Sequence, residues 1–221
     1  MPDQPTPPNF DGDPLSHILA TGTALSRVHE ARFDVCAFNP TLADAHWGGG
    51  RFDATAEDSY SYIYAAGEDA TVVAETLLRD RPADDHGARL LARKATHERR
   101  ISWLRPTADL KLVRLLSGKD LAAVGQDTWL VHARADDYGK TRRWGHAIRS
   151  WAPGAQGFIW SSRFDPEGVA YILFGDRCPP DCLEAISVDT PVPPDDNYLD
   201  RGAGAVYLGE ILEEFRVTLY P

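Results

Sequence analysis

The stretch GFIWSSRFDPEGVAYILFG, residues 157–175, contains two β-prone segments that a short polar connection separates. Both segments are rich in aromatic and aliphatic residues, many of them β-branched or aromatic types that favour extended structure. The stretch therefore predicts two strands, at residues 157–162 and 169–175, that are neighbours in one sheet.

Further strands and helices surround this pair without a regular strand–helix–strand alternation. Alternating apolar and polar residues predict strands, and apolar residues at helical spacing predict helices. The mixture favours an α+β fold with mostly antiparallel sheets and flanking helices. The other predicted strands are at residues 25–29, 59–66, 100–106, 110–116 and 216–221, and the predicted helices are at 70–79, 86–95, 118–125, 138–151 and 205–215.

The first residues, 1–14, are rich in proline and acidic side chains. We expect them to form a flexible segment in front of a single domain at residues 15–221. The segment lacks the basic and apolar regions of a signal peptide. No apolar run approaches the roughly 18–20 residues that a membrane helix needs. We therefore expect a cytoplasmic protein that does not enter a membrane.

The charge balance argues against nucleic acid as a partner. The 221 residues include 33 acidic and 23 basic side chains, which give a formal net charge of −10. Nucleic-acid binding normally needs a basic surface that displaces counterions from the phosphates. A single small anionic ligand needs only one or two arginines, so the composition still permits such a site.

Neither the cysteines nor the histidines show a recognisable metal-binding pattern. Three cysteines, an odd and sparse count, argue against the disulfide framework of a secreted protein. The CPPDC segment, residues 178–182, has no second cysteine pair, and we interpret it as a surface loop with free thiols. The seven histidines show no HExxH or comparable spacing. We expect no metal site.

Two candidate ligand-binding groups precede the first predicted long helix. Arg51 follows three glycines in GGGRFD, residues 48–53. A guanidinium group can bind a phosphate with two hydrogen bonds, and glycines let the phosphate approach the backbone. The alternative is an arginine on an exposed loop. Tyr60, Tyr62 and Tyr64 alternate on one face of a predicted strand. They either stack on a flat ligand ring or form a packed aromatic layer.

A carboxylate and two hydroxyl groups complete the set of candidates. Glu75 lies among apolar residues of the helix predicted at 70–79. It is either a solvated acid or a carboxylate in a cleft, where it would stabilise an oxocarbenium-like transition state beside a sugar. Ser161 and Ser162 end the strand predicted at 157–162, outside a GxSxG motif. We interpret them as ligand-positioning hydroxyls and not as nucleophiles.

The order of these residues resembles the RES domain family, which is named for its arginine, glutamate and serine. The resemblance runs from about Leu25 to Arg177, most of the chain. It rests on an ordered set of short motifs: Arg27 in SRVH, Gly50–Arg51, Tyr64-Ala65-Ala66, the AxxE-type helix that contains Glu75, Thr141 with Trp144, GFIWSSR at 157–163, and LFGDR at 173–177.

The resemblance implies an ADP-ribosyltransferase-like fold and an enzyme that consumes NAD⁺. The implied reaction breaks the nicotinamide–ribose bond by hydrolysis or phosphorolysis, with water or inorganic phosphate as acceptor and no further cofactor. The implied biological role is that of a toxin in a toxin–antitoxin system, neutralised by an antitoxin protein of the helix-turn-helix type.

The resemblance also assigns roles to individual residues. The catalytic residues would be Arg51, Glu75 and Ser162. The substrate-binding residues would be Arg27, Tyr64 and Ser161. Arg27 would be a second anion contact, and Tyr64 would stack on the nicotinamide. Two adjacent serines occupy the place of the family serine, so Ser161 is the alternative to Ser162.

Other functions use the same residues. The chain is alternatively a mono-ADP-ribosyltransferase that modifies a protein or a small molecule, or a nucleotide-binding module without catalysis. A structural role is the third alternative, and it predicts that Arg51 and Glu75 lie far apart. The acidic surface and tryptophans such as Trp47 and Trp151 are compatible with a homodimer.

Overall fold

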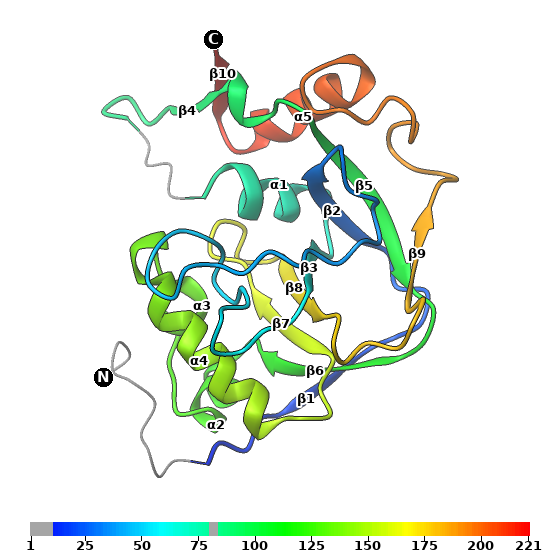
Figure 1. Cartoon of the computed structure of the whole chain (residues 1–221). Helices are drawn as coiled ribbons and strands as arrows, with labels where there is room; N and C mark the ends of the chain where they lie inside the picture. The colour runs from blue at the N-terminus through cyan, green and yellow to red at the C-terminus, as the bar shows by residue number, and fades with distance from the viewer. Residues whose placement is uncertain (1–10, 80–83) are drawn as a thin grey trace.

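The computed structural model describes residues 11–79 and 84–221 (Figure 1). A curled sheet of eight strands, in the order β1-β6-β7-β8-β3-β2-β5-β9, forms its centre, and a second sheet pairs β10 with β4. Neighbours in the large sheet are antiparallel except β6 and β7. The predicted α+β fold with mostly antiparallel pairing is confirmed.

The strands are β1 (Ser16–Leu19), β2 (Leu25–Glu30), β3 (Tyr62–Ala66), β4 (Arg89–Ala92), β5 (Arg99–Pro106), β6 (Leu110–Leu115), β7 (Gly157–Ser161), β8 (Val169–Phe174), β9 (Leu183–Ile186) and β10 (Val217–Tyr220). The α-helices are α1 (Asp69–Leu77), α2 (Gly118–Ala123), α3 (Trp129–His132), α4 (Tyr138–Trp151) and α5 (Gly202–Glu214).

The two strands predicted within residues 157–175 form the β7–β8 hairpin, and all five β7 residues pair with β8. Gly157 is required at the start of β7, because a Cβ atom there would lie 2.1 Å from the carbonyl oxygen of Ile172. Trp160 and Ile159 are buried in two different apolar cores on opposite faces of the sheet. The hairpin is therefore covered on both sides, which explains its nearly continuous apolar sequence.

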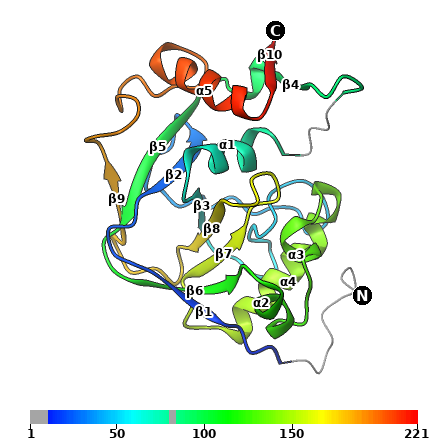
Figure 2. The ribbon, with the colours of Figure 1, turned by 180° about the vertical axis from the view of Figure 1, so that it is seen from behind.

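The large sheet opens between β2 and β3. β2 pairs with β5 over six residues and β3 pairs with β8 over five, but β2 and β3 share one residue pair, Ser26 with Ala66. In Figure 2, β2 follows β5 while β3 stays beside β8. Because the strands separate after this pair, side chains and not backbone hydrogen bonds fill the space between them.

Helix α1 packs against the sheet at this opening and contacts β2, β3 and β8. Asp69, in its first turn, is a suitable acid for the positive end of the helix dipole. Its carboxylate accepts hydrogen bonds from Trp103 Nε1 at 2.8 Å, from the Tyr207 hydroxyl at 2.6 Å, and from the Ser26 hydroxyl. These contacts attach α1 to β5, α5 and β2, and thereby hold the helix that carries Glu75.

Helix α4 covers the β7–β8 hairpin and has the bounds that the sequence predicts. Trp144 and Ile148, on its predicted apolar face, belong to the same core as Trp160. Arg149 is 2% exposed and pairs with Asp58 at 2.8 Å and with a second carboxylate at 2.9 Å. Paired in this way, a buried charge is tolerated.

The prediction of a helix at residues 86–95 is wrong. The segment contains β4 and a 3₁₀ helix, Arg93–Ala95. β4 lies parallel to β10, which comes from the end of the chain, and this pairing satisfies backbone groups that a helix would satisfy internally. The other predicted elements are present with bounds shifted by a few residues at most, and β1, α3 and β9 were not predicted.

Residues 1–10 of the predicted flexible segment lie outside the described residues. The three cysteines are free, as predicted. Cys182 is only 2% exposed and belongs to an apolar core, so the prediction of a surface loop is wrong for this thiol. Among residues 11–79 and 84–221, no helix combines the length and the apolar character of a membrane span.

Candidate functional site

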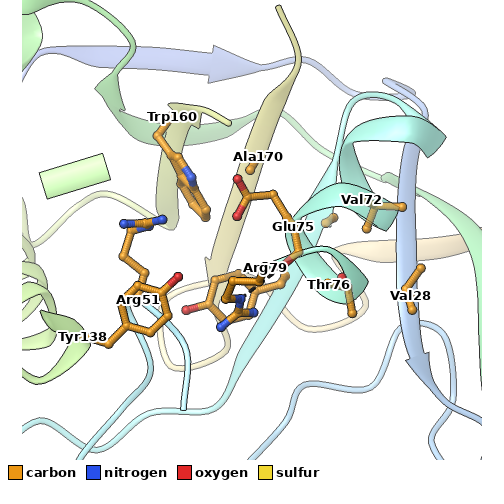
Figure 3. Close-up of a pocket in the computed structure, with 11 residues that line it drawn as sticks. Val28, Arg51, Val72, Glu75, Thr76, Arg79, Tyr138, Trp160 and Ala170 are labelled. Carbon is orange, nitrogen blue, oxygen red and sulfur yellow. Dashed lines mark hydrogen bonds between the residues drawn. The ribbon is translucent and has the colours of Figure 1, made fainter. Parts of the chain in front are cut away.

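Arg51, Tyr64 and Glu75 line one cavity of about 150 Å³ at the opening of the sheet (Figure 3). Arg51 and Glu75 point into this cavity from opposite sides, with Trp160 beside them. The structure therefore brings together three of the predicted site residues from a loop, a strand and a helix. The full lining consists of Val28, Arg51, Tyr64, Ala65, Val72, Glu75, Thr76, Arg79, Tyr138, Trp160 and Ala170.

The loop of three glycines holds Arg51 in place. Gly49 has a φ of +71°, which favours glycine. The buried Arg142 donates to the carbonyl oxygens of Gly48 at 2.7 Å and Gly50 at 3.1 Å. The Thr141 hydroxyl donates to the carbonyl oxygen of Arg51 at 2.7 Å. Helix α4 thus fixes the backbone from which Arg51 enters the cavity.

The Arg51 side chain is buried, with 3% exposed, and only part of its guanidinium group has a partner. Its Nη1 donates to the carbonyl oxygens of Ala133 at 3.1 Å and Leu130 at 3.4 Å. Its Nε and Nη2 are buried and have no hydrogen-bond partner among the described residues. Burial lowers the pKa of Arg51. Buried donors are normally paired, so these two favour a ligand that carries acceptor oxygens.

Glu75 is oriented by two donors from the end of β7. The Ser162 hydroxyl lies 2.7 Å from Glu75 Oε1, and the backbone N–H of Arg163 donates to the same oxygen at 3.2 Å. The Ser162 Oγ accepts from the backbone N–H groups of Phe164 and Asp165, both at 3.2 Å. The hydroxyl proton is therefore directed to Glu75. This arrangement suits a serine that positions Glu75.

The Tyr64 ring forms a wall of the cavity. Its hydroxyl oxygen accepts from the backbone N–H of Phe52 at 2.9 Å, and its ring meets Trp160 edge-on with 6.2 Å between centroids. Burial raises the pKa of the Tyr64 hydroxyl well above its usual value. Tyr64 therefore offers a neutral aromatic surface and not an acid or a base at neutral pH.

One group of described residues has ligand atoms close enough together to hold a metal ion. This group lies outside the cavity of Glu75. It consists of His97, Glu98 and Asp200, none of which is buried.

A model of the RES domain family matches residues 24–195 of the chain. The chain belongs to the RES domain family. The matched segment contains every predicted site residue, while α5 and β10 follow it.

The fold is similar to that of a chain in the crystal structure of the M. tuberculosis MbcT–MbcA toxin–antitoxin complex. The TM-score is 0.55, the sequence identity is 20%, and the similarity covers 76% of this chain and 84% of that chain. At this identity the comparison shows a shared fold. No curated protein gives a significant match.

The two serines that compete for the RES serine position point in different directions. Ser162 contacts Glu75, whereas the Ser161 hydroxyl donates to the carbonyl oxygen of Pro166 at 2.8 Å. Consecutive residues at a strand end face opposite sides, so only one of them reaches the α1 carboxylate.

Arg27 does not line the cavity of Glu75. Its Nη1 donates to the backbone carbonyl oxygens of Val35 at 2.5 Å and Ala37 at 3.0 Å, and burial lowers its pKa to about 10. These bonds direct the guanidinium group to the loop after β2. Arg27 lines a second cavity on that side.

Three large side chains that line the cavity of this RES domain were not among the predicted site residues: Arg79, Tyr138 and Trp160. Arg79 donates to the carbonyl oxygens of Glu75 at 3.2 Å and Gly49 at 3.3 Å. Arg51 and Arg79 both lie near the Tyr138 ring, at 5.1 and 5.4 Å from its centroid. The sequence contains a signal for Arg79. This arginine follows Glu75 by four residues, about one helical turn, and a helix places such a pair on one face.

Proposed function

We propose that this RES domain protein cleaves the bond between nicotinamide and ribose in NAD⁺, with water or phosphate as acceptor. One observation carries the proposal: a buried arginine with two unused donors faces an oriented carboxylate across a single cavity. A dinucleotide provides a partner for each, because it has phosphate oxygens for the arginine and a ribose that becomes positive during cleavage for the carboxylate. Membership of the RES family supports the same substrate.

Glu75 acts on the ribose in this mechanism. As the C1′–N bond breaks, its electron pair goes to the nicotinamide ring nitrogen, and positive charge develops on C1′ and the ribose ring oxygen. A carboxylate already held by Ser162 and the Arg163 N–H stabilises this charge without reorganisation. Nicotinamide leaves as a neutral molecule and needs no general acid. A water or phosphate oxygen then bonds to C1′, and the proton of an attacking water goes to the solvent.

The remaining lining residues hold the substrate. Tyr64 and Trp160 provide the aromatic walls against which the nicotinamide packs. Arg51 binds the phosphate next to the nicotinamide ribose through its unpaired donors. Arg79, which donates to the carbonyl oxygen of Glu75, adds a second positive charge to the cavity. It takes the role of second anion contact that the family resemblance implied for Arg27.

The proposed biological role is that of a toxin whose activity a partner protein blocks. The structural similarity to a chain of a toxin–antitoxin complex supports this role. We propose a helix-turn-helix-type antitoxin as the partner, and its defining effect would be loss of NAD⁺ cleavage in the complex.

The test is to incubate the purified protein with NAD⁺, with and without phosphate, and to separate the products by chromatography. We expect free nicotinamide together with ADP-ribose, or with its phosphate ester when phosphate is the acceptor. Glu75→Gln keeps the shape of the side chain but removes its charge, and should lower kcat about 10²- to 10³-fold. Glu68→Gln is the matched control, because Glu68 lies on the exposed N-cap of the same helix.

Other results would point to the other functions. Nicotinamide release only in the presence of a protein or small-molecule target would identify a transferase. Nucleotide binding without any release would identify a binding module. A Glu75→Gln variant with the wild-type rate would refute the mechanism.

A further inference from the structure

A second cavity of about 190 Å³ adjoins the cavity of Glu75. Both cavities are lined by Val28 of β2 and Tyr64 of β3, and these two strands separate after the Ser26–Ala66 pair. The second cavity extends from there toward the loop that follows β2. Its lining consists of Arg27, Val28, His29, Glu30, Phe33, Ala37, Asn39, Tyr62, Tyr64 and Arg99.

The size of the first cavity requires a second binding region for a dinucleotide. At about 150 Å³ it lies well below the roughly 300–1,000 Å³ of sites that enclose a ligand of that size. The two cavities together reach the lower end of this range. A ligand that places its nicotinamide ribose beside Glu75 can therefore continue past Val28 and Tyr64 into the second cavity.

The second cavity contains an arginine whose side chain has no polar partner among the described residues. Arg99 is half-buried, and its side chain makes no ion pair or hydrogen bond within residues 11–79 and 84–221. The acid in this cavity, Glu30, is paired with Arg32 at 2.7 Å. His29 is hydrogen-bonded to Ser102 and stays neutral near pH 7, since burial and the charge of Arg27 lower its pKa to about 4. The net charge of the lining is positive and suits a phosphate.

An aromatic ring lines the same cavity as this arginine. Phe33 is 36% exposed, one of the few large apolar side chains at the surface. The Arg32 guanidinium group lies 4.7 Å from its ring centroid, which holds the ring at the edge of the cavity. A purine base would stack on this ring. Because the ring is already held in place, its side chain would lose little conformational freedom on binding.

We propose that the second cavity binds the adenosine-phosphate half of NAD⁺, with Arg99 at the phosphate and Phe33 against the adenine. This inference rests on the proposed function and names what selects a dinucleotide over a mononucleotide. Nicotinamide mononucleotide would fill the cavity of Glu75 alone. NAD⁺ would fill both cavities.

The experiment compares NAD⁺ with nicotinamide mononucleotide as substrates for the full-length protein. For the wild type we expect a lower KM for NAD⁺. Arg99→Gln should raise the KM for NAD⁺ about tenfold, as expected for loss of a hydrogen bond to a charged group, with kcat unchanged. The same variant should leave cleavage of the mononucleotide unchanged. Arg93→Gln is the matched control, because Arg93 is exposed, lies outside the second cavity and loses the same charge.

A direct binding measurement complements the kinetics. ADP should compete with NAD⁺ in the wild type and lose about tenfold in affinity in Arg99→Gln, as followed by calorimetry. The inference is overturned if Arg99→Gln leaves the KM for NAD⁺ and the affinity for ADP unchanged, or if it impairs both substrates equally. Failure of the wild type to cleave either substrate would instead refute the proposed function.

Discussion

Replacing Ser162 with alanine tests how the candidate catalytic carboxylate is oriented. The Ser162 hydroxyl lies 2.7 Å from Glu75 Oε1, and its oxygen accepts from two backbone N–H groups at 3.2 Å. The substitution leaves Glu75 with one of its two donors, the backbone N–H of Arg163. It also removes the acceptor of two N–H groups in the turn after β7.

The expected magnitude follows from these contacts. A hydrogen bond to a charged group contributes about 1.5–3 kcal/mol, and 1.4 kcal/mol corresponds to a factor of about ten. We therefore expect kcat to fall about 10- to 100-fold, with a small change in KM, because the bond orients Glu75 and does not bind substrate. Stability should also fall, by roughly 2–4 °C in Tm for each kcal/mol lost.

The assay is the initial rate of nicotinamide release, with Ser161→Ala as the matched control. Ser161 is the adjacent serine, and its hydroxyl bonds to the Pro166 carbonyl and not to Glu75. The control should retain nearly the wild-type rate. A Ser162→Ala variant with the wild-type kcat, or an equal loss in Ser161→Ala, would refute the proposed orientation. A loss beyond about 10⁵-fold would also refute it, because such a loss indicates a nucleophile.

Two further predictions concern buried basic groups. Arg51→Lys should raise the KM for NAD⁺ at least tenfold in steady-state assays, because an ammonium group cannot replace the buried Nε and Nη2 donors. An unchanged KM would contradict the proposal that Arg51 binds a phosphate of the substrate. His29 has its pKa lowered from 6.5 to about 4, chiefly by burial. The folded protein favours the neutral imidazole, so between pH 6.5 and 4 the unfolded chain binds more protons than the folded protein. The free energy of unfolding should therefore fall by up to about 3 kcal/mol as the pH drops through this range. Urea unfolding at several pH values should show a weaker decline in His29→Gln, while the exposed His97→Gln should behave as the wild type.

Elements with strong local patterns were predicted well. The helix at Tyr138–Trp151 has the predicted bounds, because its apolar side chains recur at helical spacing and a proline and a glycine follow it. The β7–β8 hairpin was predicted because both strands are apolar and a short turn joins them. In these cases local sequence and tertiary packing favour the same structure.

The segment at residues 86–95 shows where local reasoning failed. Its leucines and arginines are acceptable in a helix, but β4 forms there because it pairs with β10, more than a hundred residues later in the chain. Pairing between distant segments leaves no local signal. The same reason explains why the short strands β1 and β9 were missed, since both lie at the edges of the sheet.

Residue types and their order along the chain were enough to predict the fold class, the family, and Arg51, Tyr64 and Glu75 as one ordered set. Which side chains meet in space depends on how distant segments pack, and the structure shows this. It placed Ser162 and not Ser161 against Glu75, because the direction of a side chain at a strand end depends on the register of β7. It placed Arg27 outside the Glu75 cavity, because β2 separates from β3 after one residue pair, and such a separation is a property of the whole sheet.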